Sequence, residues 1–220
     1  MKKRIVSITL VVMVLLTSSA FAYTDVPSYD AGFEAIKMVT NLGLMDGFED
    51  GSFRPDDTLT RAELAKITVI AMDLYPEEGE TIFNDVSEDY WAAGWINRAY
   101  IEGVINGRGD GSFYPDDPAT YEEAVKMIVC ALGYEPEAMT KTGWPVGYLA
   151  IASVNKITTG AEGTRGTPIT RRQFAMLLNN ALHVPIFDNR YWDPRVFYSS
   201  NEGETLMSRM INRMNRDAEE

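Results

Sequence analysis

The sequence states the same pattern of residues twice, each residue of the first copy recurring 60 positions later with no shift of register. The matched residues are an Asp-Val pair, loop glycines, an Asp-Gly-Ser-Phe run, a Pro-Asp-Asp turn and a threonine. They occupy 25–26, 43, 47, 50–53, 55–57 and 60 in the first copy, and 85–86, 103, 107, 110–113, 115–117 and 120 in the second. A unit of this size cannot bury its apolar face by itself, so the repeated units must pack on one another.

A shorter third copy follows the first two. Its landmarks are Trp144, Gly160 and Thr170, which align with Trp91, Gly107 and Thr120 when one loop is three residues shorter. The third copy lacks the Asp-Gly-Ser-Phe run, and Lys156 replaces a glycine of the other copies. Terminal repeats are expected to depart from the pattern because their neighbours differ. The sequence therefore predicts a closed set of three repeats over 23–82, 83–142 and 143–185, the last one shortened, and a C-terminal tail over 186–220.

Each repeat has the pattern of a helix, a long loop and a second helix, and Phe53 and Phe113 are expected to anchor the two long loops in the core. Apolar residues at helical spacing predict first helices over 29–44, 91–102 and 146–155. Each second helix begins at a capping box, in which a threonine and an acid or amide three residues later bond to backbone N–H groups. The three boxes are Thr60 with Glu63, Thr120 with Glu123, and Thr170 with Gln173. Because strand-like alternation is nearly absent, the predicted fold class is all-α, with a further short helix in the tail.

The first 22 residues have the three parts of a signal peptide. A basic start at 2–4 precedes an apolar run at 5–16 and a small-x-small cleavage site that ends at Ala22. We expect an exported mature chain that begins at Tyr23 and does not associate with a membrane, since no later stretch is apolar enough to span one. The formal net charge of -12 disfavours a nucleic-acid partner, because that kind of binding depends on Lys and Arg at phosphates.

Two arginines occupy positions that their own helices do not favour. Arg61 and Arg171 lie in the first turn of a second helix, where the helix dipole presents partial positive charge. One explanation is a solvated side chain paired with Asp56, Asp57 or a neighbouring glutamate. The other is an anion site built from the arginine and the free N–H groups of the helix start. Tyr121 stands at the same position in the second repeat. If anions bind, the repeats are therefore expected to bind them unequally.

The motifs together are similar to those of a known family. Its Thr-Arg-Ala-Glu signature is matched by residues 60–63, the start of its first helix by Asp85 and Tyr90-Trp91-Ala92, and its G-x-x-x-G-x-F-x-P motif by the loops. The chain resembles the S-layer homology family over about residues 23 to 185. The resemblance implies three modules in pseudo-threefold symmetry that bind secondary cell-wall polysaccharide non-covalently, at the cell surface of a Gram-positive-type envelope. It further implies a pyruvylated sugar held in grooves between repeats, with Arg61 and Arg171 in the position of the contacting arginine.

Other residues are candidates for the same site. Sugar faces stack well on indole rings, which makes Trp91 and Trp144 candidate contacts, although packing in the core would also explain them. The remaining candidates are Asp25 and Asp85, which could accept from sugar hydroxyls or cap the chain, and Gly47 and Gly107, which could admit a ligand or serve a turn.

Three other functions are alternatives to wall binding: a calcium module, an enzyme and a protein-interaction scaffold. The acidic loop after Asp46 places Phe48 where a calcium loop needs an oxygen ligand, so no metal and no cofactor are expected. The chain has one histidine, His183, and no nucleophile motif, so it is not expected to be an enzyme. The alternative function is an exported protein-interaction scaffold, in which the aromatic and amphipathic tail over 186–220 binds a protein partner or packs on its own domain.

Overall fold

The computed structural model describes residues 23–187 and 203–219, and these residues form an all-α fold. The predicted signal peptide and most of the aromatic part of the tail lie outside the described residues. The helices are α2 (Phe33–Asn41), α3 (Arg61–Ala71), α4 (Ala93–Ile101), α5 (Tyr121–Ala131), α6 (Glu135–Lys141), α7 (Val146–Val154), α8 (Arg171–Ala181) and α9 (Leu206–Asp217). None of the helices in the described part of the chain is long and apolar enough to cross a membrane.

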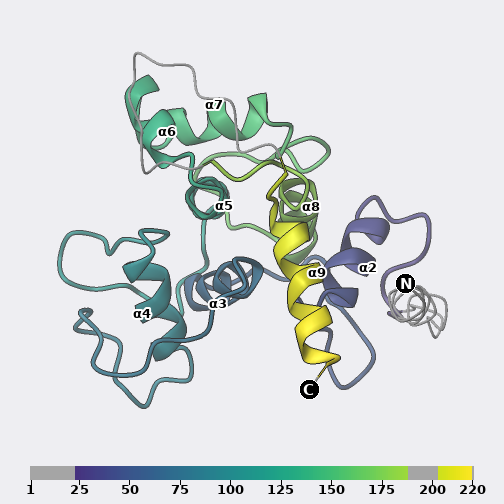
Figure 1. The fold of residues 1–220 in the computed structure, drawn as a ribbon, viewed down its shortest axis with the longest axis horizontal. Coiled ribbons are helices and arrows are strands. Elements are labelled where there is room, and N and C mark those ends of the chain that lie inside the picture. Colours follow the sequence, from purple (N-terminus) through teal and green to yellow (C-terminus); the bar gives the residue numbers. More distant parts are fainter. Residues whose placement is uncertain (1–22, 188–202, 220) are drawn as a thin grey trace, which may run out of the picture.

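The second helices of the repeats, α3, α5 and α8, gather at the centre, and the first helices surround them (Figure 1). Each first helix packs on the second helix of another repeat: α4 on α3, α7 on α5, and α2 on α8. The repeats are therefore interlocked, since the core of each one is completed by its neighbour. This arrangement explains why a single repeat cannot bury its apolar face, as the sequence pattern indicates.

Backbone hydrogen bonds at the starts of the central helices follow a cyclic order. The bonds run from Arg61 N to Asp117 O (3.0 Å), from Tyr121 N to Thr167 O (2.9 Å) and from Arg171 N to Asp57 O (2.8 Å). Repeat one thus donates to repeat two, repeat two to repeat three, and repeat three back to repeat one. The bonds satisfy N–H groups that a helix start leaves without an internal partner. The three bonds therefore form a closed cycle of contacts. The pseudo-threefold symmetry of whole repeats stays a prediction.

The predicted helix starts and loop anchors are confirmed. All three capping boxes are present, with Thr60, Thr120 and Thr170 as caps. Phe53 and Phe113 are fully buried and hold the two long loops in the core. Sequence reasoning is thus accurate where a local hydrogen-bond pattern or a large apolar side chain sets the structure.

Some helix boundaries differ from the prediction. The first helix starts at Phe33 and not at 29, because Asp30 accepts from Gly32 N at 2.7 Å in the turn that precedes the helix. The helix α6, which packs on α7, was not expected. Lys156 has a φ of 60° where the other copies have Gly43 and Gly103, so a side chain occupies a backbone conformation that favours glycine.

The tail folds back over the C-terminal ends of the three central helices. Phe187 N donates to Leu132 O after α5 at 2.8 Å, and Met207 N donates to Leu182 O after α8 at 3.0 Å. Near the end of α9, Arg216 pairs with the residue that follows the cap of α3, Asp73, at 2.6 Å. On the core side of α9, the two side chains that are fully buried are Leu206 and Met210. Figure 1 shows α9 beginning in front of α8 and running between α3 and α2 in this view, so the folded unit continues past residue 185.

Candidate functional site

Arg61, at the first position of α3, ties repeat one to repeat two. Its Nε donates to Phe113 O at 2.7 Å, and one terminal nitrogen donates to Asn106 O at 3.3 Å. The other terminal nitrogen pairs with Glu123 Oε1 at 2.5 Å. Glu123 is also the capping-box residue of α5, since its second oxygen accepts from Thr120 N at 2.8 Å. Each nitrogen of the guanidinium therefore has a partner inside the protein. The ion pair is a buried one with Glu123 of repeat two, and not a solvated one with Asp56 or Asp57.

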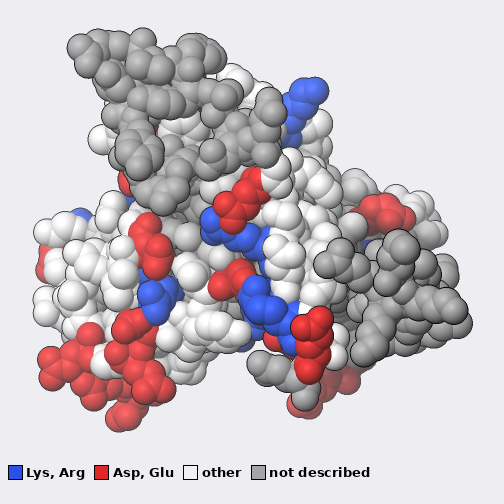
Figure 2. All heavy atoms as spheres, in the orientation of Figure 1, with Lys and Arg blue, Asp and Glu red and all other residues white. Residues whose placement is uncertain are grey.

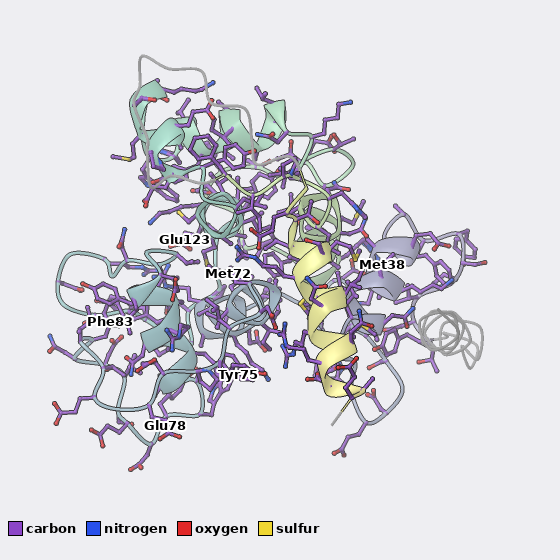
Figure 3. The ribbon with its side chains drawn as sticks, viewed as in Figure 1. Met38, Met72, Tyr75, Glu78, Phe83 and Glu123 are labelled. Carbon is purple, nitrogen blue, oxygen red and sulfur yellow. The ribbon has the colours of Figure 1, made fainter. Side chains whose placement is uncertain are left out.

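A cavity of about 510 Å³ opens beside Arg61, and we call it the Arg61 cavity. Repeat two supplies its loop over 104–108 and α5, while Trp144 and Tyr148 enter from the start of α7. Figure 3 shows Glu123 between α5 and the lobe of the molecule that contains α4. Side chains from three segments that are far apart in the sequence thus line one cavity.

The aromatic side chains of the Arg61 cavity have different roles. Trp144 is 50% exposed, so much of its indole ring is available to a ligand. Tyr148 is buried, and its hydroxyl donates to Glu135 Oε1 at 2.9 Å. Burial and the carboxylate of Glu135 raise the pKa of Tyr148 above its ordinary value, which keeps the phenol neutral. Core packing does not account for the exposure of Trp144.

Lys126 brings a further cation to the Arg61 cavity. When the Asn106 amide is oriented so that its oxygen and nitrogen are both bonded, the oxygen accepts from Lys126 Nζ at 3.0 Å. The ammonium lies 5.9 Å from the ring centre of Tyr148, within the range of a cation–π contact. These neighbours hold the ammonium in place without cancelling its charge.

The cations of the Arg61 cavity differ in how they are neutralised. Arg61 pairs with Glu123, and Arg108 pairs with Asp117 at 2.8 Å. Lys126 has no carboxylate within 4.0 Å among the residues that the structure describes. Arg61 and Arg108 are thus each neutralised by a paired carboxylate, whereas the other carboxylate of the lining, Glu135, accepts from Tyr148 and makes no ion pair with Lys126.

Arg171 makes the equivalent contacts at the start of α8. Its Nε donates to Phe53 O at 2.8 Å, and one terminal nitrogen donates to Asp46 O at 2.6 Å. No carboxylate in the described parts of the chain lies within 4.0 Å of this guanidinium. The residues that align with Lys126 and Trp144 are Lys66 of repeat one and Trp91 of repeat two, and Lys66 Nζ lies 5.9 Å from the ring centre of Trp91, which is 54% exposed. We call these residues the Arg171 cluster.

Both arginines are buried cations. Burial lowers the pKa of the Arg61 guanidinium and of the Arg171 guanidinium from their ordinary value. The principal opposing influence is the carboxylate of Glu123 for Arg61, and that of Glu63 for Arg171. Since arginine stays protonated in proteins, each position holds a positive charge that needs an acidic neighbour. Glu123 supplies it at close range, whereas Glu63 acts from beyond ion-pair distance.

At the third equivalent position, at the start of α5, the arginine, the lysine and the tryptophan are all replaced. Tyr121 is buried against Gly163, where an added Cβ would lie 2.3 Å from the ring. Met176 aligns with the two lysines, and Ala31 aligns with the exposed tryptophan. The end of the Met176 side chain lies within 3.5 Å of the position that a Cβ of Gly160 would take. This position is filled by apolar groups of the protein itself.

Asp25 and Asp85 tie each long loop to the start of its own repeat. Each carboxylate accepts from two successive backbone N–H groups, with both of its oxygens used. The bonds are Phe53 N (2.8 Å) and Arg54 N (2.7 Å) to Asp25, and Phe113 N (2.8 Å) and Tyr114 N (2.7 Å) to Asp85. The sequence left open whether these aspartates accept from sugar hydroxyls or cap the chain. The structure shows bonds to the chain.

Gly47 and Gly107 allow an aromatic ring to pack on each loop. A Cβ at Gly47 would lie 2.2 Å from the ring of Tyr23, and one at Gly107 would lie 2.9 Å from the ring of Phe83. These contacts require glycine without any ligand. Figure 3 places Phe83 inside the α4 lobe. Gly107 also lines the Arg61 cavity, so it borders the candidate site while serving the loop.

The structure thus divides the predicted site residues into three groups. Arg61, Trp144 and Gly107 border one cavity, while Arg171 and Trp91 belong to the second cluster. The aspartates and the glycine of the first loop make contacts within their own repeat. Sequence reasoning missed the lysines, although a lysine follows the capping glutamate by three residues in both of the first two copies. Within the described ranges, no group of three or more His, Cys, Asp or Glu is placed to hold a metal ion.

Comparison with known families accounts for the first two repeats. Residues 22–65 and 82–125 match the family model described as the S-layer homology domain. Both segments are S-layer homology domains. They contain the Thr60 and Thr120 capping boxes and, in the first, Arg61. The third predicted repeat lies outside the matched residues, so its membership of the family stays a prediction.

Relatives of the S-layer homology segments are cell-surface proteins. The Middle cell wall protein of Brevibacillus brevis is 33% identical over 231 residues, covering 99% of this chain and 21% of the relative. The Surface layer protein of Brevibacillus choshinensis is 33% identical over 227 residues, covering 98% of this chain and 20% of the relative. The Cellulosome-anchoring protein of Acetivibrio thermocellus is 30% identical over 145 residues, covering 62% of this chain and 32% of the relative.

The chain spans about a fifth of the length of the first two relatives. Their similarity covers the tail as well as the repeats, because nearly all of this chain is aligned. The S-layer homology domains together with these relatives give the chain an exported, cell-surface location.

Proposed function

We propose that this chain anchors a protein non-covalently to the cell wall by binding an acidic wall polysaccharide at the Arg61 cavity and at the Arg171 cluster. The observation that carries the proposal is the Arg61 cavity, in which the exposed indole ring of Trp144 and the ammonium of Lys126 belong to one lining. The anchoring role is also the one named in the Cellulosome-anchoring protein. The S-layer homology segments contain Arg61 of the first position and Trp91 of the second.

A sugar with a pyruvate ketal suits this chemistry. The ketal presents one carboxylate at the edge of a sugar ring, so a cation can bind the carboxylate while an indole packs on the ring. Trp144 offers its exposed ring to the Arg61 cavity, and Trp91 does so at the Arg171 cluster. The volume of about 510 Å³ is within the range of small-ligand sites.

The attraction must be local, because the protein as a whole repels an anionic polymer. Figure 2 shows acidic side chains gathered over the α4 lobe, where Figure 3 labels Glu78. The long-range field of a chain with a net charge of -12 opposes the approach of an acidic polysaccharide. Binding therefore depends on short-range contacts inside the cavity, and retention depends on several sites acting on one repeating polymer.

Two positions and not three are proposed to bind. At the third position Tyr121, Met176 and Ala31 replace the arginine, the lysine and the tryptophan. These three residues come from α5, from α8 and from the turns before α2, so their loss is not one local change. A bivalent anchor follows, with an effective concentration set by the distance between the two positions.

The chain is proposed to act as an anchor and not as an enzyme, and the scaffold function is the second candidate. That candidate is favoured by the outer face of α9, where Ile211 and Met214 are 45% and 42% exposed. The inner face of the same helix packs on the domain through Leu206 and Met210. The tail is therefore first a part of the fold, and a protein partner at its outer face stays a prediction.

Sedimentation with cell-wall sacculi tests the anchoring function. Sacculi are used intact and after chemical removal of their polysaccharide, and the protein that sediments is measured. We expect sedimentation with intact sacculi only, and a loss of at least about tenfold in affinity for Trp144→Ala. Tyr29→Ala is the matched control, because Tyr29 is 89% exposed. Equal sedimentation with both kinds of sacculi would contradict the proposal.

A further inference from the structure

The positive charge of Arg61 is not accessible to a ligand. The side chain of Arg61 is 9% exposed, and all three of its nitrogens have protein partners. A ligand carboxylate could take the place of Glu123 only if Glu123 moved. Glu123 is held by Thr120 N at 2.8 Å, so its movement would also open the capping box of α5. Arg61 is therefore built into the wall of the cavity.

Lys126 has the opposite character. Its ammonium is half-buried at the cavity, hydrogen-bonded to the amide oxygen of Asn106 and close to the ring of Tyr148. Both neighbours are neutral, and the carboxylate of Glu135, which also lines the cavity, lies beyond 4.0 Å from the ammonium. An ammonium has three N–H donors, so donors remain for a ligand after the bond to Asn106. A partly desolvated cation without a carboxylate partner attracts an anion more strongly than a solvated one does.

The pattern across the repeats supports the same conclusion. Lys66 occupies the equivalent position next to Trp91, and like Lys126 it has no carboxylate within 4.0 Å among the described residues. Met176 replaces the lysine at the position where Tyr121 replaces the arginine. Tyr121 lies on α5 and Met176 on α8, so two different helices have lost their cations at one place. The lysine and the arginine thus belong to one functional unit.

We infer that Lys126 is the residue of the Arg61 cavity that contacts the acidic group of the wall polysaccharide. Arg61 is then a tie between repeats that shapes the cavity and holds the loop over 104–108. The inference rests on the proposed function and names which residue meets the ligand. It assigns the affinity for anions to a residue that the capping signature does not include.

The test uses Lys126→Met, which places at this position the residue that the third repeat has. Polysaccharide released from sacculi is titrated into the full chain, and the dissociation constant is measured at two salt concentrations. We expect at least about tenfold weaker binding for Lys126→Met, with a smaller salt dependence, because one charged contact is removed. Lys126→Arg should restore most of the affinity. Lys37→Met is the control, since Lys37 is a partly exposed lysine on α2 that does not line the cavity.

Thermal unfolding of each variant separates binding from folding. Lys126→Met should unfold at the same temperature as the unchanged chain, since Lys126 makes no ion pair among the described residues. If the unchanged chain binds intact sacculi and Lys126→Met binds as tightly as Lys37→Met, the inference is overturned and the anchoring function stands. If the unchanged chain binds neither sacculi nor released polysaccharide, the proposed function fails, and the inference fails with it.

Discussion

Replacing Arg61 by alanine should destabilise the whole interlocked set of repeats. The substitution removes two charge-assisted bonds to carbonyls and the pair with Glu123, and it leaves Phe113 O buried without its donor. Bonds to a charged donor contribute about 1.5 to 3 kcal/mol each, but water from the cavity can replace those at Asn106 O and at Glu123. We therefore expect a loss of about 3 kcal/mol in the free energy of unfolding. For a domain of this size that is a decrease of about 6 to 12 °C in Tm.

Denaturant unfolding followed by circular dichroism measures this loss. Arg165→Ala is the matched control, because Arg165 is exposed and a surface substitution changes stability by less than about 0.5 kcal/mol. Glu123→Gln completes a double-mutant cycle, since glutamine serves the same capping box at Gln173 and only the charge is lost. A coupling energy near zero, or a loss below about 1 kcal/mol for Arg61→Ala, would refute the assignment of Arg61 as a tie between repeats.

Three further predictions follow from the fold. Lys156→Gly should stabilise the chain by about 0.5 to 1 kcal/mol in denaturant unfolding, because Lys156 has a φ of 60°; no gain would show that this backbone is unstrained. Met210→Ala should cost about 2 to 3 kcal/mol and Ile211→Ala less than about 1 kcal/mol, because only Met210 is buried; equal costs would show that α9 is not docked. Burial raises the pKa of Cys130 from 9.0 to about 12, so stability should be unaffected below pH 9.0 and should fall above it as the unfolded thiol ionises; Cys130→Ala should remove that part of the decrease.

The sequence predicts well those features that local patterns determine. The spacing of Thr60 and Glu63 specifies a helix start through hydrogen bonds within four residues, and the structure contains it. Phe53 is predicted to anchor its loop because a large apolar side chain among polar residues has few other places to go, and it is fully buried. The all-α class follows in the same way from periodicity within each segment.

Contacts between repeats could not be predicted from local sequence patterns. The sequence identified Arg61 as a cation in an unfavourable place but left an ion pair and an anion site as alternatives. Its partner, Glu123, lies 62 positions later, and only the fold brings the two together. Lys126 gave a weaker signal, because a lysine on a helix is usually solvated, and only the distances to Asn106 and Tyr148 place it at the cavity.

The Arg61 cavity depends on the packing of the repeats on one another. The Arg61 cavity takes residues from all three repeats, so it exists only in the complete set. The cyclic backbone bonds at the helix starts and the tail at the opposite ends hold that set together. Substitutions in the tail can therefore weaken wall binding through stability without touching the cavity, and unfolding must be measured beside every binding experiment.

The most direct test of the account is the affinity of the full chain for released wall polysaccharide before and after its acidic groups are removed by mild acid. The account predicts saturable binding to the untreated polymer that is abolished, or weakened at least about tenfold, once the carboxylates are gone. The same dissociation constant for both polymers would contradict the claim that the cations of the Arg61 cavity recognise an acidic sugar.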